Sequence, residues 1–516
     1  MHFFNKTMVL VVIMFACVLG AGKVAFAGIY IQPYLQNPQP DGITILWWTD
    51  DSERNCRVQY WRGQFENDAI ASNEYIPSMD KWVHESKLTN LSEETQYQYK
   101  VVSGKHSSKT YTFNTSKRRD SNFHFAVLGD GRTDNDTIID RHRKIARMAV
   151  SFGADIIFEV GDMVENGEAE HWGRFYRRVI TASDTNDPGS NLASKIPYHT
   201  IVGNHEIYLD KTGYPGGNLN TAMARYKALV ANPKNGSANS SWEERYYAIK
   251  YGCATFIVLD NNNDLSTTGY DNHDRLGDND TPPWSPGNEQ YKWMVKQLQD
   301  AQKNSVFTFV LFHPSPYSRG VHGDPCDAQR GIEIRVLDPI FRQYGVDAVF
   351  TSHDHFVEHC LTGPVGFEKE MNIADANNLN WLVMGNSGHT SRAQAPGWEE
   401  WMDILGNDAP PYYTVYFYDW AGDHTLCSFY DVDIIHRGKG FWQATFQVVR
   451  SDGKIFDTFS IDRKDPLRKK QSTPPTKLFG RTDNNYRLLM VGVVLVSVSA
   501  FAVIFIIKRM MLEKRG

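Results

Sequence analysis

Short apolar runs that end in a polar turn recur along the middle of the chain. In Thr200–Glu206, an apolar stretch reaches a glycine and then Asn-His-Glu. Such a run is typical of a buried strand in an α/β fold, where the carboxyl ends of the strands face a common crevice. The other runs of this kind end at Asp130, at Asp162, at His313 and at His353 with His355. The pattern predicts that these polar residues meet at one rim.

A different pattern precedes these runs. Short stretches with alternating apolar and polar residues, such as Cys56–Trp61, are separated by polar turns. They predict a small β-sandwich over residues 28–116. Farther along, Asp136–Phe152 and Glu289–Lys303 have helical periodicity between the apolar runs. Strands that alternate with helices predict an α/β domain over residues 122–463.

The N-terminal end resembles a secretory signal. Lys6 precedes the apolar run Met8–Gly20, and Ala25-Phe26-Ala27 offers a small-residue cleavage site. Residues 1–27 are therefore expected to be a signal peptide. The body of the protein is then expected outside the cytoplasm, either periplasmic or extracellular.

The C-terminal end predicts a membrane anchor. Leu488–Ile507 is twenty residues long and has no charge, which is enough to cross a bilayer as a helix. Basic residues follow it, so residues 508–516 are expected to be a cytoplasmic tail. Residues 464–487 are charged and contain two adjacent prolines, which favours an exposed stalk. The membrane is thus an expected partner through the C-terminal helix.

Composition and charge narrow the class of protein. The 516 residues are 41% hydrophobic and 22% charged, which is ordinary for globular domains and excludes a wholly disordered chain. The net charge is −6 and the sequence has no long basic run, so no nucleic-acid partner is expected. Cleavage of the signal would leave five cysteines. A disulfide between Cys326 and Cys360 is a hypothesis, and the other cysteines are interpreted as free buried thiols.

The ends of the five runs offer only oxygen and nitrogen ligands: Asp, Asp, Asn-His, His and His-x-His. One such residue is an ordinary turn residue, but five in this order favour a metal site. In their order and residue types, these motifs resemble those of the calcineurin-like metallophosphoesterase superfamily over about residues 121–460. The resemblance implies a four-layer α/β/β/α sandwich that hydrolyses phosphate esters at a two-metal centre. The sequences of Pro33–Gln36 and Leu91–Tyr99 also resemble the fibronectin type III-like domain of purple acid phosphatases.

This resemblance implies a role for each residue at the rim. Asp162 would bridge two divalent or trivalent ions, which could be Fe, Zn or Mn. His205 would not be a ligand, but would act as general acid or stabilise the phosphoryl oxygens. The nucleophile would be a metal-bridging hydroxide in an in-line displacement. The other implied ligands are Asp130 and His355 for the first ion, and Asn204, His313 and His353 for the second.

Two positions depart from the family pattern. Arg132 stands where the first motif usually has a metal-binding histidine, and arginine cannot bind a cation. Glu165 stands where purple acid phosphatases have a tyrosine. We therefore expect the first metal site to be weak or empty unless Glu165 or Asn135 completes it. Arg132 is interpreted either as a catalytic phosphate clamp or as an ion-pair partner of Asp134 or Asp162.

Loop residues add substrate-contact candidates. His389 and His322 fall on loops expected near the pocket, where ordinary loop histidines would fit as well. Glu206 is expected either to orient His205 or to be a surface carboxylate. The predicted function is hydrolysis of phosphorylated small molecules, with a phosphomonoesterase favoured over a phosphodiesterase or nucleotidase. A cell-surface binding protein with a degraded metal site is the alternative, because of Arg132.

Overall fold

The computed structural model describes most of the chain between residues 28 and 468. The described ranges are 28–53, 55–181, 183, 191–207, 219–262, 284, 286–324, 327, 331–363, 378–389, 413–419 and 426–468. The predicted signal peptide, membrane anchor and cytoplasmic tail, and nearly all of the stalk, lie outside these ranges. Among the described residues, no helix is long and apolar enough to cross a membrane.

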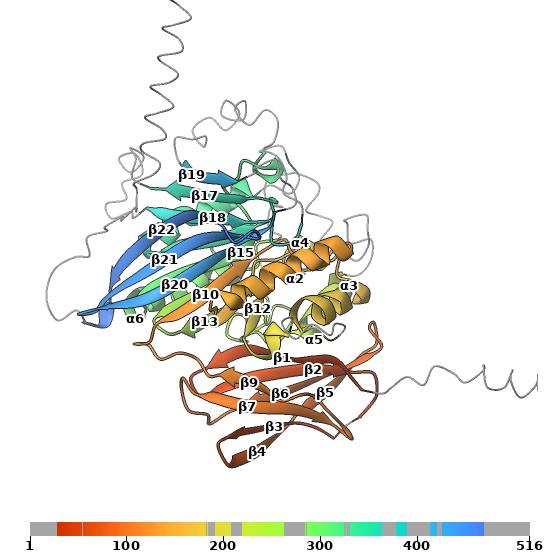
Figure 1. The fold of residues 1–516 in the computed structure, drawn as a ribbon. Coiled ribbons are helices and arrows are strands. Elements are labelled where there is room, and N and C mark those ends of the chain that lie inside the picture. The colour runs from red at the N-terminus through yellow and green to blue at the C-terminus, as the bar shows by residue number, and fades with distance from the viewer. Residues whose placement is uncertain are drawn as a thin grey trace, which may run out of the picture.

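The N-terminal domain is a sandwich of two antiparallel sheets (Figure 1). One sheet has the strand order β1-β2-β6-β5, and the other has β4-β3-β7-β8 with β9 beside β7. Leu35, Trp47 and Tyr99 meet in a buried core between the sheets, because alternate side chains of each strand point inward. The predicted all-β domain is confirmed. Its strands are β1 (Ile29–Gln39), β2 (Gly42–Thr49), β3 (Cys56–Arg62), β4 (Phe65–Ile70), β5 (Ser72–Ile76), β6 (Lys81–Leu88), β7 (Gln96–Ser103), β8 (His106–Ser107) and β9 (Tyr111–Asn114).

The larger domain contains two sheets that face each other, with the orders β12-β11-β10-β20-β21-β22 and β13-β14-β15-β16-β18-β17-β19. Phe125 and Phe158 of the first sheet pack against Phe256 of the second, with ring centroids 4.9 and 4.6 Å apart. These buried rings form the core between the sheets. The strands are β10 (Phe123–Leu128), β11 (Ile156–Glu159), β12 (Tyr198–Thr200), β13 (Tyr247–Tyr251), β14 (Ala254–Val258), β15 (Phe307–Pro314), β16 (Ala348–Ser352), β17 (Val357–Thr362), β18 (Leu379–Met384), β19 (Tyr413–Asp419), β20 (Ser428–Gly438), β21 (Phe441–Arg450) and β22 (Ile455–Lys464).

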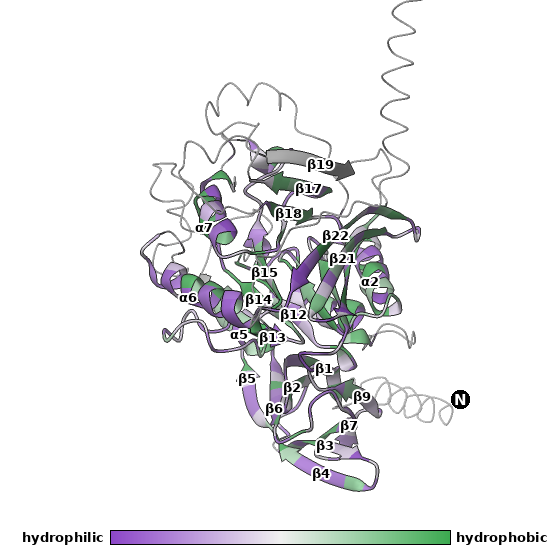
Figure 2. Ribbon diagram, turned by 90° about the vertical axis from the view of Figure 1, so that its left-hand side faces the viewer, coloured by the Kyte–Doolittle hydropathy of each residue, from purple (hydrophilic) through white to green (hydrophobic). Residues whose placement is uncertain are grey.

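Helices cover the outer faces of both sheets, which gives the four layers that the resemblance implies. Helix α2 buries Ile139 in the cluster that contains Ala126 of β10, and α6 buries Leu298 in the cluster that contains Val310 of β15. Figure 2 shows both hydrophilic and hydrophobic positions along α2 and α6, as expected for helices with one face on a sheet. The helices are α2 (Asp136–Ser151), α3 (Ala169–Arg174), α4 (Asn204–Ile207), α5 (Leu219–Leu229), α6 (Glu289–Asn304) and α7 (Asp338–Gln343), with a π-helix at Phe175–Ile180.

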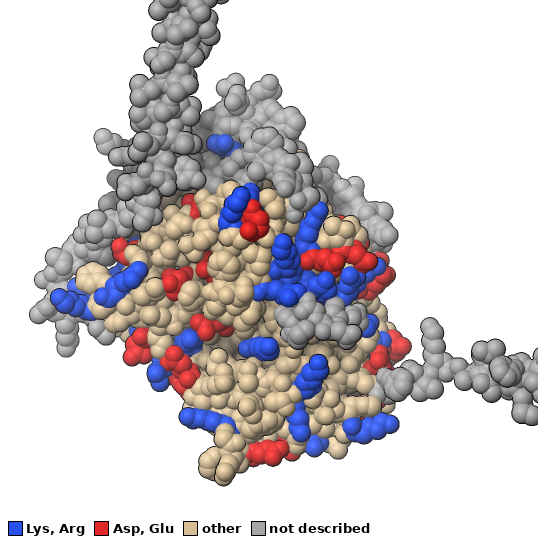
Figure 3. Space-filling view, in the orientation of Figure 1, with Lys and Arg blue, Asp and Glu red and all other residues tan. Residues whose placement is uncertain are grey.

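The solvent side of α2 carries paired charges. Arg143 lies 2.8 Å from Asp140, and Arg178 lies 2.5 Å from Asp136. Figure 3 shows basic side chains gathered beside acidic ones in this region. Exposed pairs of this kind contribute little to stability, so this region is interpreted as a solvated surface.

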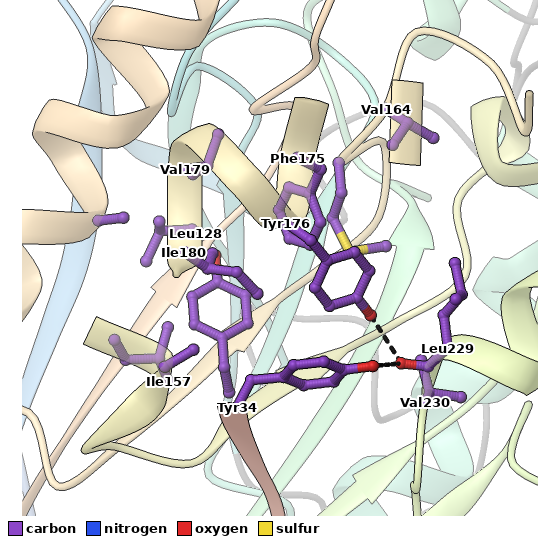
Figure 4. Close-up of a cluster of buried hydrophobic side chains, with 14 of the residues drawn as sticks. Tyr34, Leu128, Ile157, Val164, Phe175, Tyr176, Val179, Ile180, Leu229 and Val230 are labelled. Carbon is purple, nitrogen blue, oxygen red and sulfur yellow. Dashed lines mark hydrogen bonds between the residues drawn. The ribbon is translucent and has the colours of Figure 1, made fainter. Parts of the chain in front are cut away.

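The two domains share one buried core. The hydroxyl of Tyr34, on β1, donates to the backbone oxygen of Leu229 at 2.8 Å, and Tyr176 donates to the same oxygen at 2.8 Å (Figure 4). Trp48 Nε1 in turn donates to the Tyr34 hydroxyl at 3.0 Å. These residues belong to a cluster that also contains Leu128 of β10. The sandwich is therefore part of the same packed unit as the α/β domain.

The described cysteines are buried free thiols: Cys56, Cys253, Cys360 and Cys427. Cys326, the partner hypothesised for Cys360, lies outside the described residues, and the disulfide finds no support at Cys360. Burial raises the pKa of the Cys360 thiol well above its usual value. A thiol with a raised pKa is a poor nucleophile, so this residue is interpreted as structural.

Candidate metal centre

Strand ends from both sheets meet at one rim. Asp130 follows β10, and Asp162 follows β11, which is parallel to β10. His313 lies near the end of β15, and His353 directly follows β16, which is parallel to β15. Parallel neighbours have their carboxyl ends at the same edge of a sheet. The rim predicted from the apolar runs is therefore present.

The backbone of this rim is unusual. Asp130, Arg132, Asp162 and His353 have φ values of 52°, 58°, 55° and 75°. Left-handed backbone is uncommon for residues other than glycine, and such strain gathers at functional sites. A β-carbon on Gly203 would lie 2.5 Å from the backbone nitrogen of Asp162, so the glycine before Asn-His-Glu is required by this close approach.

One group of ligand atoms converges on His313 Nε2. Asn204 Oδ1 lies 2.9 Å from this nitrogen, His353 Nδ1 lies 3.1 Å away, and Asp162 Oδ1 lies 3.3 Å away. The other ring nitrogen of His313 lies 2.8 Å from the backbone oxygen of Val160. That contact keeps a proton on Nδ1, so Nε2 is the nitrogen that would bind a metal. Ligands about 2 Å from one tetrahedral ion lie about 3.3 Å apart, so this group fits a metal.

A second group shares Asp162. Asp130 Oδ1 lies 3.3 Å from His355 Nε2, and ligand atoms of Asp130, Asp162 and His355 all lie within 4.8 Å of one another. Asp130 Oδ2 accepts hydrogen bonds from the His353 N–H at 2.7 Å and from the Ser352 hydroxyl. These bonds leave Oδ1 directed at the site. The structure thus separates the six implied ligands into the two sets that the resemblance implies.

The electrostatics of this centre call for a cation. Asp130 Oδ1 and Asp162 Oδ2 are buried and accept no hydrogen bond from any described residue, although buried polar atoms are normally satisfied. Burial, together with the charge of Asp162, raises the pKa of Asp130 to about 7. Burial also opposes ionisation of Asp162, but His205, His313 and Arg132 together hold the pKa of this carboxyl well below its usual value.

Arg132 lies beside the shared carboxylate. Its Nη1 is 2.8 Å from Glu165 Oε2, and its Nη2 is 3.4 Å from Asp162 Oδ2. The ion pair with Asp162 is thus one of the two interpretations made from sequence, whereas the pair with Glu165 was not anticipated. Asp134 does not pair with Arg132 and lies instead 3.6 Å from His389 Nε2. Asn135 accepts the Ile138 N–H at 3.2 Å as the cap of α2.

The missing ligand of the first site is therefore not supplied by either residue proposed from sequence. Glu165 is engaged by Arg132, and Asn135 is engaged by the first turn of α2. Helix caps need a side-chain oxygen for the unpaired N–H groups of the first turn. These two local demands explain why neither residue joins the group of Asp130, Asp162 and His355.

His205 lies at the edge of the centre, with 16% of its side chain exposed. Its Nε2 is 3.7 Å from Asp162 Oδ2, and its backbone N–H donates to Asp162 Oδ1 at 3.0 Å. Nδ1 lies 2.8 Å from Arg132 Nη1 and 2.6 Å from the backbone oxygen of Glu165. The contact with Arg132 needs Nδ1 without a proton, whereas the contact with the Glu165 oxygen needs a proton on Nδ1. Burial and the charge of Arg132 lower the pKa of His205 to about 3, so the imidazole is neutral in this arrangement.

The surface role considered for Glu206 is wrong, because its side chain is fully buried. Its carboxylate accepts backbone N–H groups from the two turns that carry Asp162 and Asn204. The donors are Asp162 and Met163 at 2.9 Å, Val164 at 3.3 Å and Gly203 at 2.6 Å. The sequence indicated this role only by placing an acidic residue in the polar turn that follows an apolar strand. Glu206 is thus a positioning residue whose backbone partners were not predicted from the sequence.

The two loop histidines lie beside ligand histidines. The ring of His322 stacks on that of His353 with centroids 3.9 Å apart, and its Nδ1 is 2.9 Å from Asp327 Oδ1. The ring of His389 lies 4.1 Å from that of His355. Both therefore border the two groups of ligand atoms, as expected for substrate-contact candidates.

Comparison with known proteins finds matches to two protein families. The calcineurin-like phosphoesterase family matches residues 123–357, and the purple acid phosphatase N-terminal domain matches residues 30–115. The two matches follow one another along the chain, and the predicted resemblance to calcineurin-like phosphoesterases with a purple acid phosphatase-type N-terminal domain is confirmed.

Individual relatives are distant. The "Fe(3+)-Zn(2+) purple acid phosphatase 12" of Arabidopsis thaliana is 26% identical over 341 residues, which are 62% of this chain and 62% of that protein. The match therefore spans less than two thirds of the relative's length. The purple acid phosphatase PPD1 from yellow lupin shares the fold, with 18% identity, a TM-score of 0.64 and coverage of 88% of this chain and 78% of that one. PhoD has a TM-score of 0.57 at 13% identity, with 88% of this chain and 94% of that one covered.

Proposed function

We propose that the protein is a metal-dependent phosphoesterase and that its favoured substrates are phosphate monoesters of small molecules. The observation that carries this proposal is the convergence of six ligand-type side chains into two groups that share Asp162. Carboxylate, amide and imidazole ligands suit Fe, Zn or Mn. When bound, such ions activate water near neutral pH and neutralise the charge of a phosphate.

The residues of the chain divide the remaining work. Asp130, Asp162, Asn204, His313, His353 and His355 would hold the metals. His205 would bind a phosphoryl oxygen or protonate the leaving oxygen, because it borders Asp162 and reaches the solvent side of the centre. Arg132 would offer guanidinium N–H groups to the phosphate. His322 and His389 would contact the rest of the substrate, since their rings lie against those of ligand histidines and border the centre.

The proposal is tested by assaying the full chain, purified in detergent, with p-nitrophenyl phosphate and bis(p-nitrophenyl) phosphate after loading with Fe, Zn or Mn. Faster hydrolysis of the monoester is expected. Asp162→Asn should lose metal and activity together, because Asp162 belongs to both groups. Absence of hydrolysis of both esters by the metal-loaded protein would favour the binding-protein alternative.

We also propose that the body lies outside the cytoplasm and is tethered by residues 488–507. The fold supports a tether that leaves the centre open. Lys464, at the end of β22, lies opposite Phe441 at the start of β21, and Ile434 of β20 lies opposite Phe123 at the start of β10. The end of β22 and the start of β10 are therefore on the same side of the sheet. The chain thus leaves the sheet at the edge opposite Asp130. Extraction of the protein from membranes by alkaline carbonate, which releases proteins without a membrane-spanning segment, would contradict the tether.

A further inference from the structure

The two departures from the family pattern meet in the structure. Arg132 and Glu165 are 33 residues apart, yet Arg132 Nη1 lies 2.8 Å from Glu165 Oε2. Only 6% of the Arg132 side chain and 27% of the Glu165 side chain are exposed. A buried guanidinium needs a carboxylate partner, and a covered pair of this kind is stronger than an exposed one. The two departures are therefore one feature of the centre.

This pair directs a positive charge at the shared carboxylate. Arg132 Nη2 lies 3.4 Å from Asp162 Oδ2, whereas Asp162 Oδ1 lies 3.3 Å from His313 Nε2. One oxygen of Asp162 thus faces the ligands of the second metal, and the other faces a guanidinium. The backbone holds Arg132 in place as well, because its N–H donates to the Asp162 backbone oxygen at 3.0 Å from a residue with φ of 58°.

Further contacts hold the turn that carries Glu165. Asp134, which follows Thr133 in the chain, lies 3.6 Å from His389 Nε2. The Glu165 backbone N–H donates to the Thr133 hydroxyl at 3.2 Å. Glu165 is therefore held in position through its backbone and in turn holds the guanidinium over Asp162. In this arrangement Glu165 is a positioning residue that acts through Arg132.

From this geometry we infer that the Arg132 guanidinium, held in place by Glu165, supplies positive charge beside Asp162 instead of the first metal ion, so that the centre works with one tightly held metal and one guanidinium. A fixed positive charge beside Asp162 disfavours a cation in the group of Asp130, Asp162 and His355, to which no fourth His, Cys, Asp or Glu belongs among the described residues. The N–H groups of the guanidinium would also donate to phosphate oxygens of a bound substrate. This phosphate-binding role rests on the proposed function, whereas the metal stoichiometry does not.

Metal binding to the full chain tests the inference without any assay of activity. Chelator-treated protein is titrated with Zn²⁺ or Mn²⁺ by calorimetry, and the metal retained after dialysis is measured by elemental analysis. We expect one retained ion in the wild type and two in Arg132→His, which removes the charge and adds a ligand. Arg132→Gln, which only removes the charge, should tighten the weak site about tenfold. Two equally retained ions in the wild type, or one in Arg132→His, would overturn the inference.

Controls separate this effect from general damage. Arg143→Gln removes the same charge from the exposed pair with Asp140 and should leave metal binding unchanged. Glu165→Gln should keep the retained ion but raise KM for p-nitrophenyl phosphate, and Glu165→Asp should restore part of the loss. Equal effects of Glu165→Gln and Arg143→Gln on KM would remove Glu165 from the inference. Absence of hydrolysis with the expected metal counts would contradict the proposed function and leave the stoichiometry standing.

Discussion

Glu206 and Asp162 are 44 residues apart, yet the Glu206 carboxylate accepts the backbone N–H of Asp162 at 2.9 Å. The same carboxylate accepts the N–H of Gly203 at 2.6 Å. One buried side chain thus joins the turn after β11 to the turn before α4. It fixes the direction in which Asp162 presents its oxygens to both groups of metal ligands.

Replacement of Glu206 by alanine should destabilise the metal-free protein by about 3 kcal/mol or more, because several buried N–H groups would lose their acceptor. The free energy of unfolding in urea measures this loss. Glu170→Ala is the matched control, since Glu170 is an exposed partner of Arg174 on α3. Similar losses for the two variants would show that the Glu206 carboxylate does not hold these turns.

His205→Ala should lower kcat by roughly a hundred- to ten-thousand-fold, the range typical for loss of a positioned acid or base. Metal content should not change, because the His205 ring belongs to neither group of ligands. Both quantities are measured on the same metal-loaded samples. His106→Ala on β8, in the N-terminal domain, is the control. Unchanged turnover would remove His205 from the mechanism, and lost metal would make it a ligand.

Glu244 predicts a dependence of stability on pH. Burial raises its pKa to about 8, against the pull of Lys234, whose Nζ lies 3.7 Å away. The folded state therefore binds this proton more tightly than the unfolded state, whose carboxyl has a pKa of about 4.3. The resulting stability is complete below pH of about 4 and is lost as pH rises toward 8.

Glu244→Gln should remove this dependence, because the amide does not ionise. The variant should be more stable than the wild type by up to about 4–5 kcal/mol at pH 8, and similar to it at pH 4.5. Urea unfolding at the two pH values measures the difference. Glu243, a neighbour with 31% of its side chain exposed, supplies the control Glu243→Gln. A constant difference at both pH values would contradict the assignment to Glu244.

Tyr34→Phe should destabilise both domains together. The variant leaves the Trp48 N–H without its acceptor and removes one donor to Leu229. A cost of about 1–3 kcal/mol is expected for buried groups of this kind. Because the domains share one core, calorimetry should show a single transition that moves to lower temperature. Tyr75→Phe, which loses an exposed hydrogen bond to Asp80, should leave the transition temperature unchanged. Two separate transitions would contradict the shared core.

The sequence by itself determined the strands of the centre and the kinds of ligand at their ends. A strand buried in the middle of a sheet has a continuous apolar sequence, and the polar turn that follows it is formed by the next few residues. Asp130, Asp162, His313 and His353 could therefore be placed at one rim before the structure was known. The alternation that predicts the N-terminal sandwich is local in the same way.

Only the tertiary structure decided which side chains meet across these turns. Glu165 pairs with Arg132, and Glu206 binds the turn of Asp162, because the strand order β12-β11-β10 brings the turns together. Nothing local distinguishes a carboxylate that will be exposed from one that will meet buried N–H groups. The environment of a charged side chain is a property of the packed sheet, since burial and partner charges come from residues distant in sequence.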